Sequence, residues 1–167
     1  MVVVMLMAIL AAAAIPTRSA IEPDLLDAAA GEVRSALRFA REQVILQGSP
    51  VLVDMETQAN TVKVRWGTCK NPGALLTDPR TRQSMVLALN RSPLTKAMTL
   101  DAQVLLADGN RHRGLVFDAT GSISQACAVA SESNKGAPVQ GSQVVLKLET
   151  RERVVSLWPA TGRVSGP

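Results

Sequence analysis

A lone histidine between two arginines is the first place where the residue types could do chemistry. His112 is the only histidine, and it stands in NRHRG between Arg111 and Arg113. Neighbouring cations disfavour a protonated imidazole, and no motif for a nucleophile, a metal or a phosphate accompanies this residue. We therefore interpret His112 as a solvated loop residue, and the sequence favours a function other than catalysis.

The two cysteines offer a second kind of chemistry. Cys69 and Cys127 lie far apart and form no C-x-x-C pair, so neither a zinc ribbon nor a thioredoxin-type redox motif is supported. Cys69 lies in a turn-rich stretch and Cys127 follows a predicted strand, so the two could meet at one end of a sheet. They are either two independent small buried residues or, in an exported chain, one disulfide.

Basic residues outnumber acidic ones and form small clusters. The chain has 18 lysines and arginines against 14 aspartates and glutamates. Arg111 and Arg113 form one cluster, Arg151 and Arg153 form another, and Arg163 stands near the end. This charge favours acidic neighbours such as anionic lipid, acidic protein faces or nucleic acid. Since only two Phe and two Trp are present for stacking on single strands, these arginines are either scattered solvated side chains or contacts for DNA phosphates.

The first sixteen residues, MVVVMLMAILAAAAIP, carry no polar side chain. As a helix, residues 1–15 reach about 22 Å, which is short of the ~30 Å hydrocarbon core of a bilayer. The run is too long and too rich in Met, Leu and Ala for a buried strand, and no basic residue precedes it as in a secretory signal. The residues alone leave two interpretations open, an unusual signal peptide and a membrane helix whose first turns are missing.

An amphipathic helix is predicted beyond Pro16 and Pro23, ending near Gly48 and Pro50. Apolar residues spaced by three and four form one stripe, which we expect to pack on the core: Leu26, Ala29, Val33, Leu37, Ala40 and Val44. The opposite face carries the charged residues Asp24, Asp27, Arg34, Arg38, Arg41 and Glu42.

From Val51 onward the apolar period becomes two, which predicts antiparallel strands. VLVDME and TVKVRW form a predicted hairpin across TQAN. Further short strands are expected in SMVLALN, AQVLLA, GLVF, QVVLKL and RVVSLW, with turns at NPG, ADGN, DATG and ETRE and a surface loop over residues 130–142. The length of 167 residues suits one domain, in which a β-rich part packs on the second half of the helix.

This order of elements resembles the type IV pilin architecture. The apolar head is similar to the part of a prepilin that follows its cleavage motif. EVRSALRFAREQVILQGSPV resembles the helix of the minor pseudopilin H and FimT family, in which a SALRxAR stretch leads to a G-x-P-V exit into the first strand. GLVFDATGSI and ATGRV resemble that family's late strands and turns. The resemblance implies an α+β, type IV pilin-like fold, with a long N-terminal helix packed on a C-terminal antiparallel β-sheet domain.

The resemblance also implies a structural role without a cofactor, as a minor pilin-like subunit of a type II secretion pseudopilus or a type IV pilus. It divides the chain into a membrane segment (1–16), an amphipathic helix (17–48) and a periplasmic β-rich domain (49–167). It places Met1 a few residues inside the mature protein, because the basic leader and the first mature residues are absent. For a domain in the periplasm we expect Cys69 and Cys127 to form a disulfide.

The expected partners are other pilins or pseudopilins, the inner-membrane assembly platform and inner-membrane lipid. Packing in the bilayer and in the filament would fall to Val4, Leu6, Ile9, Leu10, Ile15 and Pro16. A DNA-binding minor pilin for DNA uptake is the alternative, because FimT-like members bind DNA through a basic C-terminal GRxR pattern. Here GRVS keeps Arg163 but has Ser165 in place of the second arginine, so nucleic acid is the second choice of partner.

Overall fold

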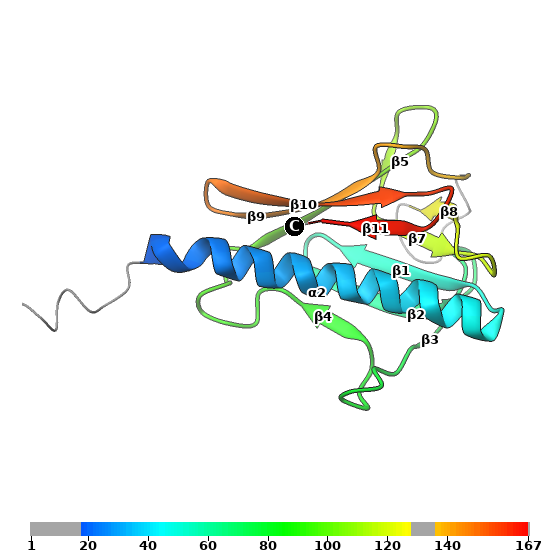
Figure 1. Cartoon of the computed structure of the whole chain (residues 1–167), viewed down its shortest axis with the longest axis horizontal. Helices are drawn as coiled ribbons and strands as arrows, with labels where there is room; N and C mark the ends of the chain where they lie inside the picture. Colours follow the sequence, from blue (N-terminus) through cyan, green and yellow to red (C-terminus); the bar gives the residue numbers. More distant parts are fainter. Residues whose placement is uncertain (1–17, 128–135, 167) are drawn as a thin grey trace, which may run out of the picture.

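In a computed structural model, which describes residues 18–127 and 136–166, these residues form one long helix and two antiparallel sheets. The helix α2 (Arg18–Gln47) precedes all the strands and lies over strands of both sheets (Figure 1). This arrangement confirms the predicted α+β class. The apolar run at the start of the chain lies outside the described residues.

Helix α2 packs through the stripe that its sequence predicts. All six members are buried: Leu26, Ala29, Val33, Leu37, Ala40 and Val44. The helix begins at Arg18, so that Pro23 lies inside it rather than before it. It ends as predicted, because Gly48 has a positive φ of 67° and donates its N–H to the Val44 carbonyl at 2.8 Å, which satisfies a terminal carbonyl of the helix.

The first sheet has the order β3-β2-β1-β7-β8. β3 and β4 pair with the same edge of β2, β4 with its first residues and β3 with its last residues. Its strands are β1 (Val51–Glu56), β2 (Thr61–Gly67), β3 (Pro72–Leu75), β4 (Val86–Ala88), β7 (Gly114–Phe117) and β8 (Ile123–Cys127). β1 and β2 form the predicted hairpin, in which Glu56 pairs with Thr61 across the TQAN turn. This turn uses Asn60 in the left-handed region, at a φ of 51°.

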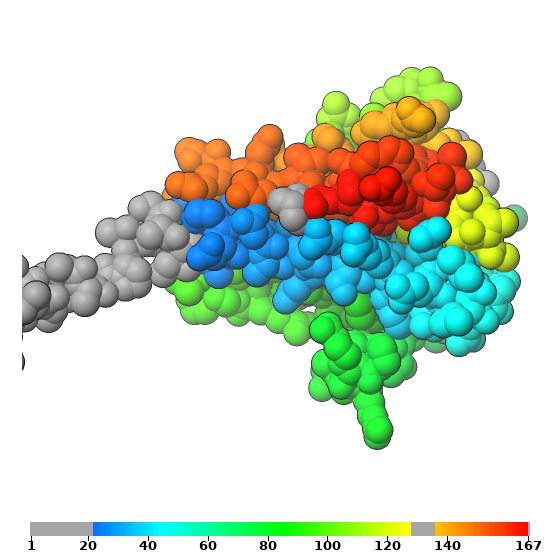
Figure 2. Space-filling view, viewed as in Figure 1, coloured from blue at the N-terminus to red at the C-terminus, as the bar shows by residue number. Residues whose placement is uncertain are grey.

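The second sheet has the order β11-β10-β9-β5-β6. Its strands are β5 (Thr99–Leu105), β6 (Arg111–His112), β9 (Gln143–Leu148), β10 (Arg151–Trp158) and β11 (Arg163–Ser165). The last strand therefore lies at the edge of this sheet, and in Figure 2 the C-terminal residues run beside α2. The buried side chains of α2 and of both sheets form one continuous hydrophobic core.

A second, smaller cluster lies on the other side of the first sheet. It consists of Leu52, Val116 and the two cysteines, and all four are fully buried. Along β1, Val51 and Val53 belong to the main core whereas Leu52 belongs to the small cluster, as the alternation of side chains in a strand requires. The first sheet is therefore covered on both faces over part of its width.

Two predictions about local structure are wrong. NPG was expected to be a turn, but Pro72 and Gly73 open strand β3 and the bends precede them. Proline is tolerated there because it is the first residue of an edge strand. His112 was expected to be a solvated loop residue, but it is buried in β6, where it pairs with Val104. Alternation along the strand leaves Arg111 exposed and turns the imidazole inward.

Asp54 in β1 is a buried carboxyl whose pKa is raised, mainly by burial and then by the charge of Glu56, against the opposing charges of Arg65 and Lys63. The folded state therefore favours the protonated form. The stability that the Asp54 carboxyl contributes to the folded state is fully present below the ordinary carboxyl pKa of about 3.9. It is lost as the pH rises through the raised pKa. We expect Asp54→Asn to be more stable than the wild type at pH 7, and the gain should vanish below about pH 4, as measured by denaturant unfolding.

Glu56 provides the opposite control for this prediction. Lys63 donates a hydrogen bond to its carboxylate and lowers the pKa of Glu56. Glu56→Gln should therefore reduce stability at pH 7 and have no effect in acid. Equal pH profiles for the Asp54→Asn and Glu56→Gln variants would contradict the assignment of the two shifts.

Candidate functional site

Three arginines of α2 fasten the helix to the β-rich domain, two of them at the C-terminal end of the chain and one at the β7–β8 turn. Arg34 donates to the Gly166 carbonyl at 2.9 Å, and Arg38 donates to the Val164 carbonyl at 3.3 Å. Arg41 donates through Nε to the Gly121 carbonyl in the β7–β8 turn, at 3.2 Å. The spacings of four and three residues place all three on one side of the helix, and we call this set the arginine ladder.

The arginine ladder assigns a role to the SALRxAR stretch. The sequence predicted these arginines only as part of a charged face opposite the core stripe. In the structure they join α2 to β11 and to the β7–β8 turn, so the helix, the last strand and this turn form one unit. Their acceptors are backbone carbonyls 80 or more residues away along the chain, which no residue pattern near the helix could reveal.

We expect Arg41→Met to lower the free energy of unfolding by about 1–2 kcal/mol, because the variant keeps the aliphatic stem and leaves the Gly121 carbonyl without its charged donor. Chemical denaturation of the full chain in neutral detergent would measure the change. Arg111→Met is the matched control, since Arg111 is exposed on β6 and should change stability by less than about 0.5 kcal/mol. Equal losses in both variants would contradict the role of the arginine ladder.

Two glycines allow the close approach on which the arginine ladder depends. A Cβ atom on Gly162 would lie 1.7 Å from the Gly121 carbonyl oxygen, and Gly162 also has a positive φ of 61°. The turn after β10 and the turn after β7 therefore touch through their backbones. Arg41 lies against both turns, since its Nε would be 3.1 Å from the same Cβ atom.

Two of the five arginines predicted as DNA contacts are engaged by acidic residues of α2. Arg153 forms an ion pair and hydrogen bonds with Asp27, which lower the pKa of the Asp27 carboxyl and raise that of the guanidinium. Arg151 lies 3.9 Å from the buried Glu22 carboxylate. These contacts join β10 to the first half of the helix.

The other three arginines lie elsewhere. Arg163 pairs with Trp158 across β10 and β11, and its guanidinium stands over the indole ring, 5.6 Å from the centroid. At about 3.3 Å per residue, this end of β10 is roughly 17 Å from Arg153. Arg111 and Arg113 are exposed beside His112, in and after β6 at the far edge of the second sheet. The structure thus distributes the predicted contacts over three places instead of one continuous basic surface.

Cys69 and Cys127 form a disulfide in the structure, with their Cα atoms 5.9 Å apart. The bond runs from the loop after β2 to the end of β8, two strands beyond β1 in the sheet order. With Leu52 and Val116 beneath it, the disulfide covers the face of the first sheet that lies away from the helix. We call this cluster the disulfide cap.

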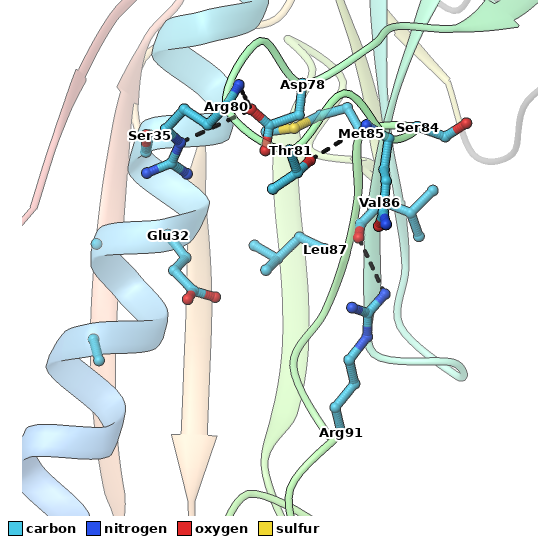
Figure 3. A pocket seen from close by; sticks show the side chains of 13 residues that line it. Glu32, Ser35, Asp78, Arg80, Thr81, Ser84, Met85, Val86, Leu87 and Arg91 are labelled. Carbon is cyan, nitrogen blue, oxygen red and sulfur yellow. Dashed lines mark hydrogen bonds and ion pairs between the residues drawn. The ribbon is translucent and has the colours of Figure 1, made fainter.

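A groove of about 530 Å³ separates α2 from the segment that links β3 to β4 (Figure 3). This segment projects from the body of the protein in Figure 2. Charges of both signs line the groove, among them Glu32 of the helix and Arg80, which lies 3.8 Å from Asp78. Arg91 donates to the Val86 carbonyl at 3.4 Å. With balanced charges, the groove gives no sign of which ligand it would select.

Residues 18–127 and 136–166 contain neither a cluster of metal ligands nor a membrane-spanning helix. No group of three or more His, Cys, Asp or Glu side chains in these ranges could hold a metal ion. No helix described there is long and apolar enough to cross a membrane. The predicted packing residues Val4, Leu6, Ile9, Leu10, Ile15 and Pro16 lie outside the described residues.

Comparisons with known proteins are consistent with the fold. Residues 29–157 match the family described as type II transport protein GspH. Among solved structures, the chain is similar to the minor pseudopilin EpsH from the type 2 secretion system of Vibrio cholerae, with 12% identity, a TM-score of 0.56, and coverage of 85% of this chain and 95% of EpsH. It is also similar to the type IV minor pilin FimU of Pseudomonas aeruginosa, with 14% identity, a TM-score of 0.51, and coverage of 88% and 91%. The sequence matches no curated protein.

Proposed function

Because the chain belongs to the family of the type II transport protein GspH, we propose that it is a minor pilin-like structural subunit of a type II secretion pseudopilus or a type IV pilus. The observation that carries this proposal is the family match, which runs from the first half of α2 to the last residues of β10. The similarity to EpsH and FimU supports it at the level of the fold. The proposed role is assembly rather than catalysis, and it requires no cofactor.

The way in which α2 is held suits such a role. The helix is fixed by its buried stripe, by the arginine ladder and by the ion pairs to β10, so it moves with both sheets as one body. In the proposed role, these contacts would let force on the helix pass directly to the β-rich domain. DNA uptake is the less favoured function, because the predicted phosphate contacts are dispersed and two of them are paired with acidic residues.

We propose the same three segments as above, with residues 1–16 in the inner membrane, residues 17–48 as the helix and residues 49–167 as the periplasmic domain. In this arrangement the apolar segment rests in the bilayer before assembly and packs against the helices of other pilins afterwards. Lipid and the inner-membrane assembly platform are further proposed partners.

Deletion and complementation in the native host would test the proposal. Deleting the gene should abolish protein secretion or surface piliation, and the full chain should restore it. A Leu10→Arg variant should not restore it, because an arginine near the middle of a membrane helix costs about 2.5–3.5 kcal/mol in insertion. Leu94→Arg makes the same chemical change at an exposed position of the described domain and should complement fully.

Two readouts in the same deletion strain would identify the machine. Loss of secreted enzymes with intact pili would indicate a pseudopilus, and loss of pili would indicate a type IV pilus. A strain that retains both, or that is rescued by Leu10→Arg, would contradict the proposal. A loss of DNA uptake alone would favour the DNA-binding alternative.

A further inference from the structure

A second groove, of about 300 Å³, lies between α2 and β11 at the far end of the helix. We call it the arginine groove, because three of the six residues that line it are arginines: Arg38, Arg41, Glu42, Gly162, Arg163 and Val164. Two of these arginines belong to the arginine ladder, and the third lies on the strand opposite the helix.

The arginine groove carries a net positive charge that the described residues do not neutralise. Three guanidinium groups face one carboxylate, that of Glu42, which gives a net charge of +2. Among the ion pairs of the described residues, none involves these three arginines. Arg151 and Arg153 provide the contrast, since both are paired with carboxylates of the helix. An anionic group in the arginine groove would therefore find cations that lack an acidic partner.

Each of the three guanidinium groups is held in place by a contact that leaves some of its N–H donors unused. Arg38 uses one terminal nitrogen on the Val164 carbonyl, and Arg41 uses Nε on the Gly121 carbonyl. Arg163 stands over the ring of Trp158, a contact that takes up a face of the guanidinium but none of its N–H groups. A guanidinium has five N–H donors and a neutral carbonyl does not cancel its charge, so each arginine can still bind a carboxylate.

Three exposed apolar side chains lie on α2 and β10, close in the chain or in strand pairing to residues of the groove. Leu46, one helical turn beyond Glu42, is 76% exposed, and Ile45, which lies against Gly121, is 51% exposed. Trp158 beneath Arg163 is 40% exposed. Tryptophan and arginine are the residue types most enriched at the energetic centres of protein–protein interfaces. The combination favours a protein partner over a free anion or a nucleic acid.

The place of the groove in the molecule argues against lipid as the partner. Glu42 is 24 residues beyond Arg18, the first residue of α2, which corresponds to about 36 Å along the helix. In the proposed orientation the membrane lies at the Arg18 end. The groove therefore faces away from the bilayer, toward the next component of an assembly.

From these observations we propose that the arginine groove docks an acidic segment of a neighbouring pilin-like subunit, a segment that presents carboxylates to the three arginines and an apolar side chain to Ile45, Leu46 and Trp158. This inference rests on the proposed function and adds to it the site and the chemistry of one contact. Charge complementarity selects the partner, and the apolar rim would supply most of the buried area.

Binding of a defined peptide to the full chain in neutral detergent micelles would test the inference. The probe is a fluorescently labelled peptide of sequence EEELLEEE, and its anisotropy reports binding. Arg163→Gln should weaken binding about tenfold, because a charge-assisted contact to a carboxylate is lost. Glu42→Gln should strengthen binding about threefold, because it removes the opposing charge. Arg111→Gln, an exposed arginine on another sheet edge, should leave the affinity unchanged.

Control probes decide between the possible partners. The peptides QQQLLQQQ and KKKLLKKK should bind at least tenfold more weakly than the acidic probe. Equal binding of QQQLLQQQ, no effect of Arg163→Gln, or a DNA duplex that outcompetes the acidic peptide would each overturn the inference. In the native host, Arg163→Glu should reduce secretion or piliation. Full complementation by this variant would reject the docking site while leaving the proposed structural role intact.

Discussion

Replacing both Cys69 and Cys127 by alanine is expected to lower the free energy of unfolding by about 4 kcal/mol. The disulfide closes a loop of 58 residues, and in the chain-entropy model a loop of this length gives a stabilisation of that size. The alanines also leave space above Leu52 and Val116 in the disulfide cap. Denaturant unfolding of the full chain in neutral detergent, followed through Trp66 and Trp158, would measure the loss.

Reduction provides the matched control for this prediction. A reducing agent should destabilise the wild-type protein by a similar amount and should not affect the alanine variant further. If the variant and the wild type have the same unfolding midpoint without a reducing agent, the disulfide makes no contribution to stability. A chain that is exported has an oxidising environment in which the bond persists, which agrees with the proposed periplasmic domain.

The sequence predicted those parts of the fold that depend on a local period. The stripe from Leu26 to Val44 has helical spacing, which specifies both the helix and its buried face. The alternation from Val51 to Trp66 specifies the hairpin, but it gives a single buried face only in β2, because β1 is buried on both faces. His112 shows where such reasoning fails. Its neighbours suggested a loop, but His112 belongs to the short strand β6, where it pairs with Val104 of β5. A two-residue strand is too short to produce a period.

The candidate interaction surfaces were less predictable, for a related reason. The acidic partners of Arg151 and Arg153 lie on α2, more than 120 residues earlier, so the sequence could not show that these arginines are paired. The arginine groove likewise forms only when the helix and β11 meet. The cysteine pairing was foreseeable because only two cysteines exist, although the expectation depended on export. Residue types were visible in the sequence, whereas the proximity of distant segments was not.

Gly162→Ala is expected to cost more than about 3 kcal/mol of unfolding free energy. Its φ of 61° is unfavourable for alanine by about 1–2 kcal/mol. The new Cβ would also meet the Gly121 carbonyl oxygen at 1.7 Å, a backbone atom that cannot rotate away. The two turns must therefore separate, and Arg41 loses its acceptor as they do. Unfolding of the variant in the same detergent assay would measure the cost.

Gly109→Ala separates strain from steric overlap in this prediction. Gly109 has a φ of 80°, but no atom lies within 4 Å of the Cβ position, so only the conformational cost of about 1–2 kcal/mol applies. A second test uses Arg41→Met in the Gly162→Ala background, where it should cost little because the contact to Gly121 is already broken. Equal losses for the two glycine variants, or an undiminished effect of Arg41→Met, would show that the turns do not need this approach. The expected non-additivity would instead establish that the helix, the β7–β8 turn and the C-terminal turn are energetically coupled, and two of these segments, the helix and the C-terminal turn, line the arginine groove from opposite sides.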